Sequence, residues 1–115
     1  MTEGPSNPGT LKPGEAVALE PVLAVVPGSI VSRILIKQSA GNVTLFSFDV
    51  GQALSEHTAP FDALAYVLSG RAEIAVGGKA TVVQTGEAVF MPAHVPHALK
   101  ALEALKMLLV MIKNP

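Results

Sequence analysis

The chain has 115 residues, of which 50% are hydrophobic and 15% are charged, with a net charge of −1. This length fits one domain, and the composition excludes a disordered chain. Lys and Arg do not cluster, so we expect no binding of nucleic acid or of an anionic membrane surface. The chain has no cysteine, which excludes disulfides, thiolate metal sites and cysteine nucleophiles.

The N-terminal residues differ in composition from the rest of the chain. Residues 1–15 are rich in glycine and proline, so we expect a flexible arm there and a single domain over 16–115. The arm lacks the basic start and apolar core of a signal peptide, and the longest apolar run, 107–112, is too short to span a bilayer. We therefore expect a soluble, cytoplasmic protein. Residues 16–26 fit a short edge strand or a turn of helix equally well.

From residue 30 onward, short segments rich in β-branched residues alternate with turn signals. Gly77-Gly78 fits a tight hairpin turn, and the segment before it alternates, with Ala72, Ile74 and Val76 on one face. Strands of this length with regular turns predict an all-β sandwich or barrel. The expected strands lie in residues 30–37, 42–50, 63–70, 71–76, 79–84, 87–92 and 94–99.

Residues 98–109 permit two interpretations. They consist of strong helix formers with leucines near helical spacing, which favours a helix. The overlapping segment 106–113 is apolar on both faces, which suits a buried central strand equally well.

Two segments share a regular spacing of glycine, proline and histidine. Segment 51–70 begins and ends on glycine and reaches His57 after five intervening residues. Segment 86–97 begins on glycine, reaches Pro92 after five residues and ends on His97. This spacing resembles the cupin superfamily, and in particular its small, single-domain, RmlC-like conserved-barrel members.

The resemblance covers about residues 30–112 and implies a fold. Cupins are double-stranded β-helix barrels of jelly-roll type, so an all-β barrel is expected. In that fold residues 106–112 form the last strand, which a barrel needs to close its edge, and residues 102–105 form the turn before it.

The resemblance also implies a metal site inside the barrel. Family members hold a divalent metal such as Fe, Mn, Ni or Zn with two histidines and a glutamate from the first motif and a third histidine from the second. His57 matches the first histidine and His97 the third, whereas Ala59 and Ala63 stand at the second histidine and the glutamate. Two of the four ligands are therefore present.

Two imidazoles make a weak site, because catalytic zinc and non-haem iron centres keep three protein ligands. His94, Asp62 and Glu56 are the candidates for a third ligand, although Glu56 should face away from the site in a regular strand and is most simply surface charge. Asp62 would reach inward only if its strand bulges there, and otherwise caps a turn. The plainer interpretation of His94 is an exposed residue at the barrel rim. Met91, Met107 and Met111 fit either the lining of an apolar pocket or core packing.

Three functions follow from these residues. The first is a cupin that binds a divalent metal weakly through His57 and His97 and acts on or senses a small organic molecule. The second is a metal-free binding or sensing module without catalysis. The third is a metal-free isomerase or epimerase with a histidine base and Tyr66 or Asp62 as its partner. Whether any reaction is catalysed is left open by the sequence.

The outer faces of two strands are also apolar. Leu64, Tyr66 and Leu68 share one face of their strand, and neither face of 106–113 is polar. Because a small barrel cannot bury both faces of its strands by itself, we expect the segment 16–30, a partner subunit or both to cover the outside. A homodimer through a strand face is predicted.

Overall fold

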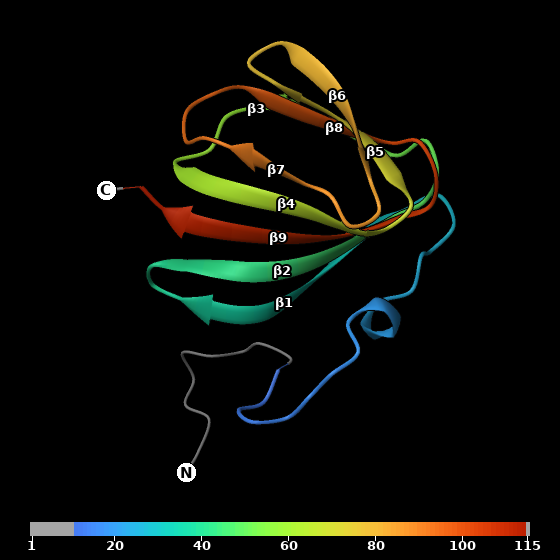
Figure 1. Ribbon diagram of the computed structural model, residues 1–115, viewed down its shortest axis with the longest axis vertical. Coiled ribbons are helices and arrows are strands. Elements are labelled where there is room, and N and C mark those ends of the chain that lie inside the picture. The colour runs from blue at the N-terminus through green and yellow to red at the C-terminus, as the bar shows by residue number, and fades with distance from the viewer. Residues whose placement is uncertain (1–10, 115) are drawn as a thin grey trace.

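The computed structural model describes residues 11–114, which form β-strands joined by short turns and one short 3-10 helix (Figure 1). The predicted all-β fold is therefore confirmed. The elements are η1 (Glu20–Val22), β1 (Ile30–Gln38), β2 (Gly41–Phe48), β3 (Ala53–His57), β4 (Phe61–Ser69), β5 (Arg71–Val76), β6 (Lys79–Gln84), β7 (Ala88–Met91), β8 (His97–Ala101) and β9 (Leu105–Lys113).

The strands form two antiparallel sheets that face each other (Figure 1). One sheet has the order β1-β2-β9-β4-β7 and the other the order β3-β8-β5-β6. Strands that are distant in the sequence thus lie side by side, as β2 and β4 do on either side of β9. This crossed pairing is the double-stranded β-helix that the resemblance implies.

The main core lies between the two sheets. Ala72 and Ile74 of β5 are fully buried, which confirms the alternation predicted for that strand. Opposite them, Ala65 and Val67 of β4 and Phe48 of β2 are also fully buried. β4 and β5 therefore direct alternate side chains into the barrel, as the pleat requires.

The last strand settles the ambiguity of residues 98–109. They form the end of β8, a bend and most of β9, so the helical interpretation is wrong. Tertiary packing outweighs the local helix propensity here, because β9 pairs with both β2 and β4 and buries Leu105 and Met107 in the core.

The N-terminal segment covers part of the outer face of the five-stranded sheet. Its short helix η1 is the turn of helix that the sequence left open. Leu23, only 6% exposed, packs against Leu35 and Leu45 in a second apolar cluster. Lys106 fixes η1 by donating to the carbonyl oxygen of Glu20 at 2.7 Å and lies 3.1 Å from its carboxylate.

The arm predicted over residues 1–15 falls mostly outside the described residues. Of its last part, Leu11 packs against the same outer cluster, and its backbone N–H donates to the carbonyl of Leu35 at 3.4 Å. Within residues 11–114, no helix is long and apolar enough to cross a membrane.

Candidate functional site

His57 and His97 lie directly opposite each other on neighbouring strands. They are cross-strand partners at the ends of β3 and β8, with ring centroids 4.3 Å apart in an edge-to-face arrangement at 68°. His57 is exposed and His97 is half-buried, which places the pair at the rim of the barrel interior. Two residues 40 positions apart in the sequence are thus joined as the motif spacing predicts.

A bulge in β3 directs His57 inward. Leu54 and His57 are three positions apart, so a regular strand would place them on opposite faces. The register with β8 shifts between these two residues, and both side chains line the same cavity. The irregularity therefore re-aims the histidine, as bulges beside functional sites commonly do.

The cavity beneath the histidines is small and almost wholly apolar. Its volume is about 50 Å³, and a water molecule needs roughly 10–15 Å³, so it admits a ligand group of a few atoms. Among residues 11–114, the two imidazoles are the only polar side chains that line it. It is lined by Phe46, Leu54, His57, Met91, His97, Leu99, Met107 and Leu109.

Both imidazoles are held by the same kind of hydrogen bond. Nδ1 of His57 lies 2.8 Å from the carbonyl oxygen of Ser55, and Nδ1 of His97 lies 3.2 Å from that of Val95. A carbonyl can only accept, so each Nδ1 carries the proton and donates it. In the neutral rings both Nε2 atoms then keep a free lone pair, which is how metal-binding histidines are commonly oriented.

The loop before His97 is pinned at several points. Asp62 Oδ1 accepts from the backbone N–H of Ala93 at 2.9 Å, and His94 donates its backbone N–H to the carbonyl of Ala59 at 2.8 Å. His94 has a φ of 66°, the left-handed conformation that favours glycine. These contacts fix the loop that presents the Val95 carbonyl to His97.

The structure does not bring Asp62 or His94 together with the histidine pair as a third ligand. Across residues 11–114, no three His, Cys, Asp or Glu side chains form a group that could hold a metal ion. β4 stays in regular register at Asp62, whose second carboxylate oxygen accepts from Nδ2 of Asn114 at 3.1 Å. β4 therefore has no bulge at Asp62, and the inward orientation of Asp62 depended on such a bulge.

These residues fit a tightly held hard divalent metal poorly. The cavity offers two imidazoles and no carboxylate, whereas such centres use three protein ligands. Ala63, at the glutamate position, is only 7% exposed and lies between Met91 on β7 and Met111 on β9 in the sheet register. Two histidines of the ligand set that the resemblance implies are therefore present, and its acidic ligand is replaced by Ala63.

The sequence identified part of the cavity lining. Met91 and Met107 line the cavity, as one interpretation of the methionines expected, whereas Met111 does not. Phe46 and Leu54 were not singled out, although their place on inward faces next to motif residues was a usable signal.

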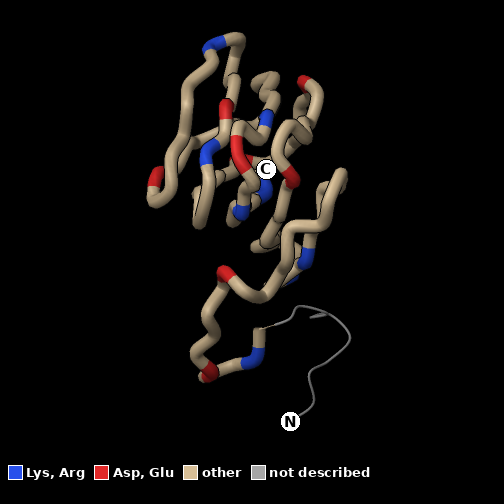
Figure 2. Tube along the Cα trace, turned by 90° about the vertical axis from the view of Figure 1, so that its right-hand side faces the viewer, with Lys and Arg blue, Asp and Glu red and all other residues tan. Residues whose placement is uncertain are grey.

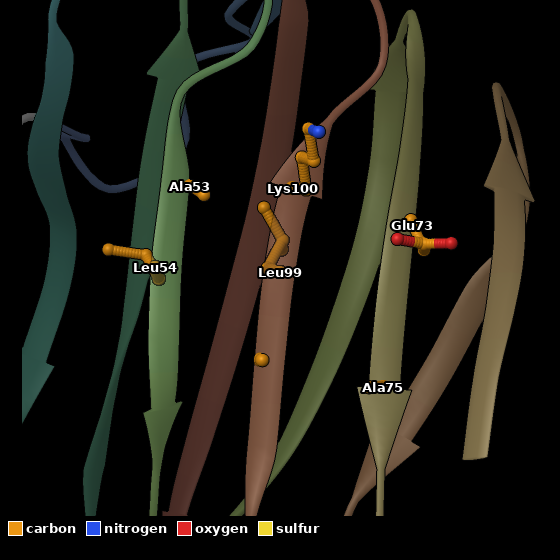
Figure 3. A pocket seen from close by; sticks show the side chains of 7 residues that line it. Ala53, Leu54, Glu73, Ala75, Leu99 and Lys100 are labelled. Atoms are coloured by element: carbon orange, nitrogen blue, oxygen red, sulfur yellow. The ribbon is translucent and has the colours of Figure 1, made fainter. Parts of the chain in front are cut away.

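Three other hollows on the described surface contain no histidine. A hollow of about 170 Å³ lies on the sheet of β3, β8 and β5, where Glu73 and Lys100 are cross-strand neighbours over an alanine floor (Figure 3). Acidic and basic residues are interspersed along the trace in Figure 2 rather than gathered in one patch. The histidine pair is therefore the best candidate for function.

Comparisons with known proteins agree with this geometry. The cupin domain model matches residues 44–112. The structure of SPY1581 from Streptococcus pyogenes, a conserved protein of unknown function, is similar with a TM-score of 0.85 and 35% identity, over 91% of this chain and 92% of that one.

Two further structures are similar. A cupin superfamily protein from Desulfitobacterium hafniense has a TM-score of 0.84 and 24% identity, over 90% of this chain and 95% of that one. A cupin 2 conserved barrel domain protein from Leptotrichia buccalis is 40% identical with a TM-score of 0.77, over 80% of this chain and 45% of that one. No curated protein matches the sequence. The family model and the similar structures together show that this chain belongs to the cupin family.

Proposed function

We propose that this cupin is a small-ligand-binding module in which His57 and His97 are the recognition groups. The observation that carries the proposal is that both Nδ1–H groups donate to backbone carbonyls while both rings line one small cavity. Of the described side chains that line the cavity, the two Nε2 lone pairs are then the polar groups available to a ligand. Two fixed acceptors in an apolar pocket orient a ligand, as the few polar groups of binding pockets generally do.

The cavity favours a particular kind of ligand. Because no charged side chain lines it, an anionic or cationic organic group entering it would lose its hydration without gaining a partner. A small, largely apolar molecule with one hydroxyl or amide donor fits better, with the donor at the histidines and the apolar part against Leu99 and Phe46.

Catalysis by a histidine base has less support. Tyr66 lies on the outward face of β4, and Asp62 is engaged with Ala93 and Asn114, so neither reaches the cavity as an acid partner. Because acid–base catalysis generally needs a positioned group on each side of the proton transfer, we favour binding over isomerisation or epimerisation.

A weakly bound divalent metal is the second candidate. The fixed Nδ1–H groups favour it, because ligating histidines usually donate that proton to a carbonyl or carboxylate. Metal content measured by mass spectrometry after incubation with Fe, Mn, Ni or Zn, compared with His57→Ala and His97→Ala variants, tests this candidate. Metal retained by the parent and lost from both variants would support it, whereas an empty parent would rule it out.

The binding proposal is tested by NMR with a library of small neutral fragments. We expect hits that shift the Nε2 resonances of His57 and His97 in the parent and that are lost in His97→Ala. His94→Ala is the matched control, because His94 is exposed and does not line the cavity. Fragments that bind the parent and His97→Ala equally would contradict the proposal.

We also propose that the chain forms a homodimer through the uncovered part of the five-stranded sheet. Phe90, Leu64, Val110, Val43 and Ile36 are successive register partners across all five strands. The two residues of this row on the edge strands β7 and β1 are exposed to solvent, Phe90 to 59% and Ile36 to 39%. Residues 1–10 carry no large apolar side chain besides Met1, so we expect a second copy of the chain to cover this surface.

A further inference from the structure

The four-stranded sheet ends in a strand with a free edge. Among the strands that the structure describes, only β5 pairs with β6, and β6 lies at the end of the molecule opposite the N-terminal segment (Figure 1). Val82, near the middle of β6, is 46% exposed. The edge of a sheet presents unpaired N–H and C=O groups, which serve as a template for pairing with another strand.

The register of the β5–β6 hairpin identifies the backbone groups on that edge. Val76 and Lys79 flank the two-residue turn, so they form a hydrogen-bonded pair. Hydrogen-bonded and non-hydrogen-bonded pairs alternate along an antiparallel ladder, so every second residue of β6 directs its N–H and C=O groups away from β5. These residues are Ala80, Val82 and Gln84.

Glu87 occupies one end of the free edge. Its Oε1 accepts from the backbone N–H of Gln84 at 2.8 Å, and its own N–H donates to the Gln84 carbonyl at 2.9 Å. Both backbone groups of Gln84 are thus satisfied, whereas within residues 11–114 no strand lies beside those of Ala80 and Val82. The edge therefore has a carboxylate at its Gln84 end and the exposed ammonium of Lys79 at its other end.

The space between β6 and the other sheet is open beside this edge. Thr81 and Val83 share the inward face of β6, yet Thr81 is exposed and Val83 is only 2% exposed. Two adjoining hollows of about 440 and 230 Å³ lie between β6 and β7, and both are lined by Thr81 and Val89. They leave room for the side chains of a further strand beside β6.

The free edge is complementary to itself. Two copies of β6 can pair antiparallel about a two-fold axis, with Thr81 opposite Thr81 of the partner subunit. Ala80 of each chain then lies opposite Val82 of the partner subunit. Both residues direct their backbone groups to the edge, so each such pair exchanges both of its N–H···O bonds. Cross-strand threonine pairs are also favourable.

The charges at the two ends of the edge agree with the same register. Lys79 lies opposite Val83 of the partner subunit, one residue from the Gln84 N–H that holds the Glu87 carboxylate. The ammonium of each chain is then beside the carboxylate of the other, and the two-fold axis repeats this contact at the far end. The sequence of β6 thus supplies both halves of a symmetric interface.

We propose that β6 is a second self-association surface, through which two copies of the chain join their four-stranded sheets into one continuous antiparallel sheet. Ala80 and Val82 supply the backbone hydrogen bonds, and Lys79 and Glu87 form ion pairs between the chains. This surface belongs to a different sheet from the proposed sheet-face dimer and does not depend on it. Because one short strand buries less area than a standard interface, the contact is dissociated in dilute solution and forms as the concentration rises.

The test is sedimentation velocity of the full chain over a concentration series. All proteins carry Leu64→Glu, so that the sheet-face contact does not influence the result, and we expect this background to pass from monomer to dimer. Adding Val82→Pro removes an N–H that points to the free edge and no bond to β5, a position where edge strands tolerate proline. It should weaken association at least about tenfold, because that N–H is used at both ends of the two-fold contact.

The matched control is Val82→Thr, which keeps the N–H and the branched side chain and should associate like the background. Thermal unfolding verifies that the variants are folded. A background that stays monomeric at every concentration would overturn the inference. Equal association of the Val82→Pro and Val82→Thr proteins would also overturn it, because the chains would then meet through another surface.

Exchange of the charges supplies a second readout. Lys79→Glu and Glu87→Lys each place like charges at both ends of the contact, so each should weaken self-association by roughly tenfold. An equimolar mixture of the two variants restores opposite charges at both ends and should associate like the background. A mixture that associates no better than the separate variants would contradict the proposed register.

Discussion

Restoring the acidic residue of the motif at position 63 should both destabilise the chain and create a metal site. Ala63 is 7% exposed and faces the barrel interior between Met91 and Met111. A glutamate there adds four heavy atoms to a packed core and brings a carboxylate beside two imidazoles. Two histidines and one carboxylate form the ligand set of several catalytic zinc and iron centres.

The magnitude follows from the burial of the site. Inserting extra atoms into a packed core costs about 1–3 kcal/mol, and a buried polar group without a partner costs about 1–3 kcal/mol more. A loss of about 3 kcal/mol in the free energy of unfolding lowers Tm by roughly 12–24 °C in a domain of this size. Zinc at about 100 times its Kd raises the free energy of unfolding by about 2.7 kcal/mol, because it binds only the folded state.

The assay is thermal unfolding of Ala63→Glu with and without zinc. Ala80→Glu, at an exposed position on the edge strand β6, is the matched control and should show neither effect. The parent should respond to zinc much less than Ala63→Glu, because it offers two imidazoles alone. If Ala63→Glu melts with the parent and zinc raises neither Tm, then position 63 does not face the histidines and the transfer of the motif is wrong.

Three further predictions concern stability and assembly. Gly70 has a φ of 88°, and a Cβ there would collide with the backbone carbonyl of Ala104, so Gly70→Ala should cost at least about 3 kcal/mol in urea unfolding; an unchanged midpoint would contradict this. Asp62→Ala removes two acceptors of a half-buried carboxylate, so we expect a loss of about 1–2 kcal/mol and faster hydrogen exchange of the Ala93 amide, whereas unchanged exchange would show that Asp62 does not hold the loop. Leu64→Glu should convert a dimer to a monomer in light scattering without lowering Tm, and a parent that is monomeric at every concentration would refute the dimer.

The fold was largely predictable because its signals are local. Period-two alternation in Ala72 and Ile74 and the Gly77-Gly78 turn specify strands and their ends, and both were found as expected. Strand β3 was not among the expected strands, and the strand expected at 94–99 lies at His97–Ala101. Residues 98–109 were ambiguous because helix propensity is a local property, whereas the burial of Leu105 and Met107 depends on β2 and β4, which flank β9 and are distant in the sequence. The contact of Leu23 with the outer face of the sheet is also long-range. The sequence therefore left open whether the segment 16–30, a partner subunit or both cover that face.

The histidine pair was predictable from motif spacing, but its surroundings were not. The inward orientation of His57 depends on a bulge in β3, and nothing in the sequence locates that bulge between Leu54 and His57. The role of Asp62 likewise depends on which backbone amide the fold brings to it, and Ala93 is 31 positions away. Long-range register is set by the whole sheet, which local patterns do not encode.

The measurement that tests the central claim most directly is the tautomeric state of the three histidines, read from long-range ¹H–¹⁵N correlations in labelled protein at alkaline pH. Our account predicts that His57 and His97 both carry their proton on Nδ1 and leave Nε2 free, because the carbonyls of Ser55 and Val95 accept from Nδ1. Protonation of either ring on Nε2 would mean that this nitrogen has no free lone pair, and the proposed ligand site would be contradicted.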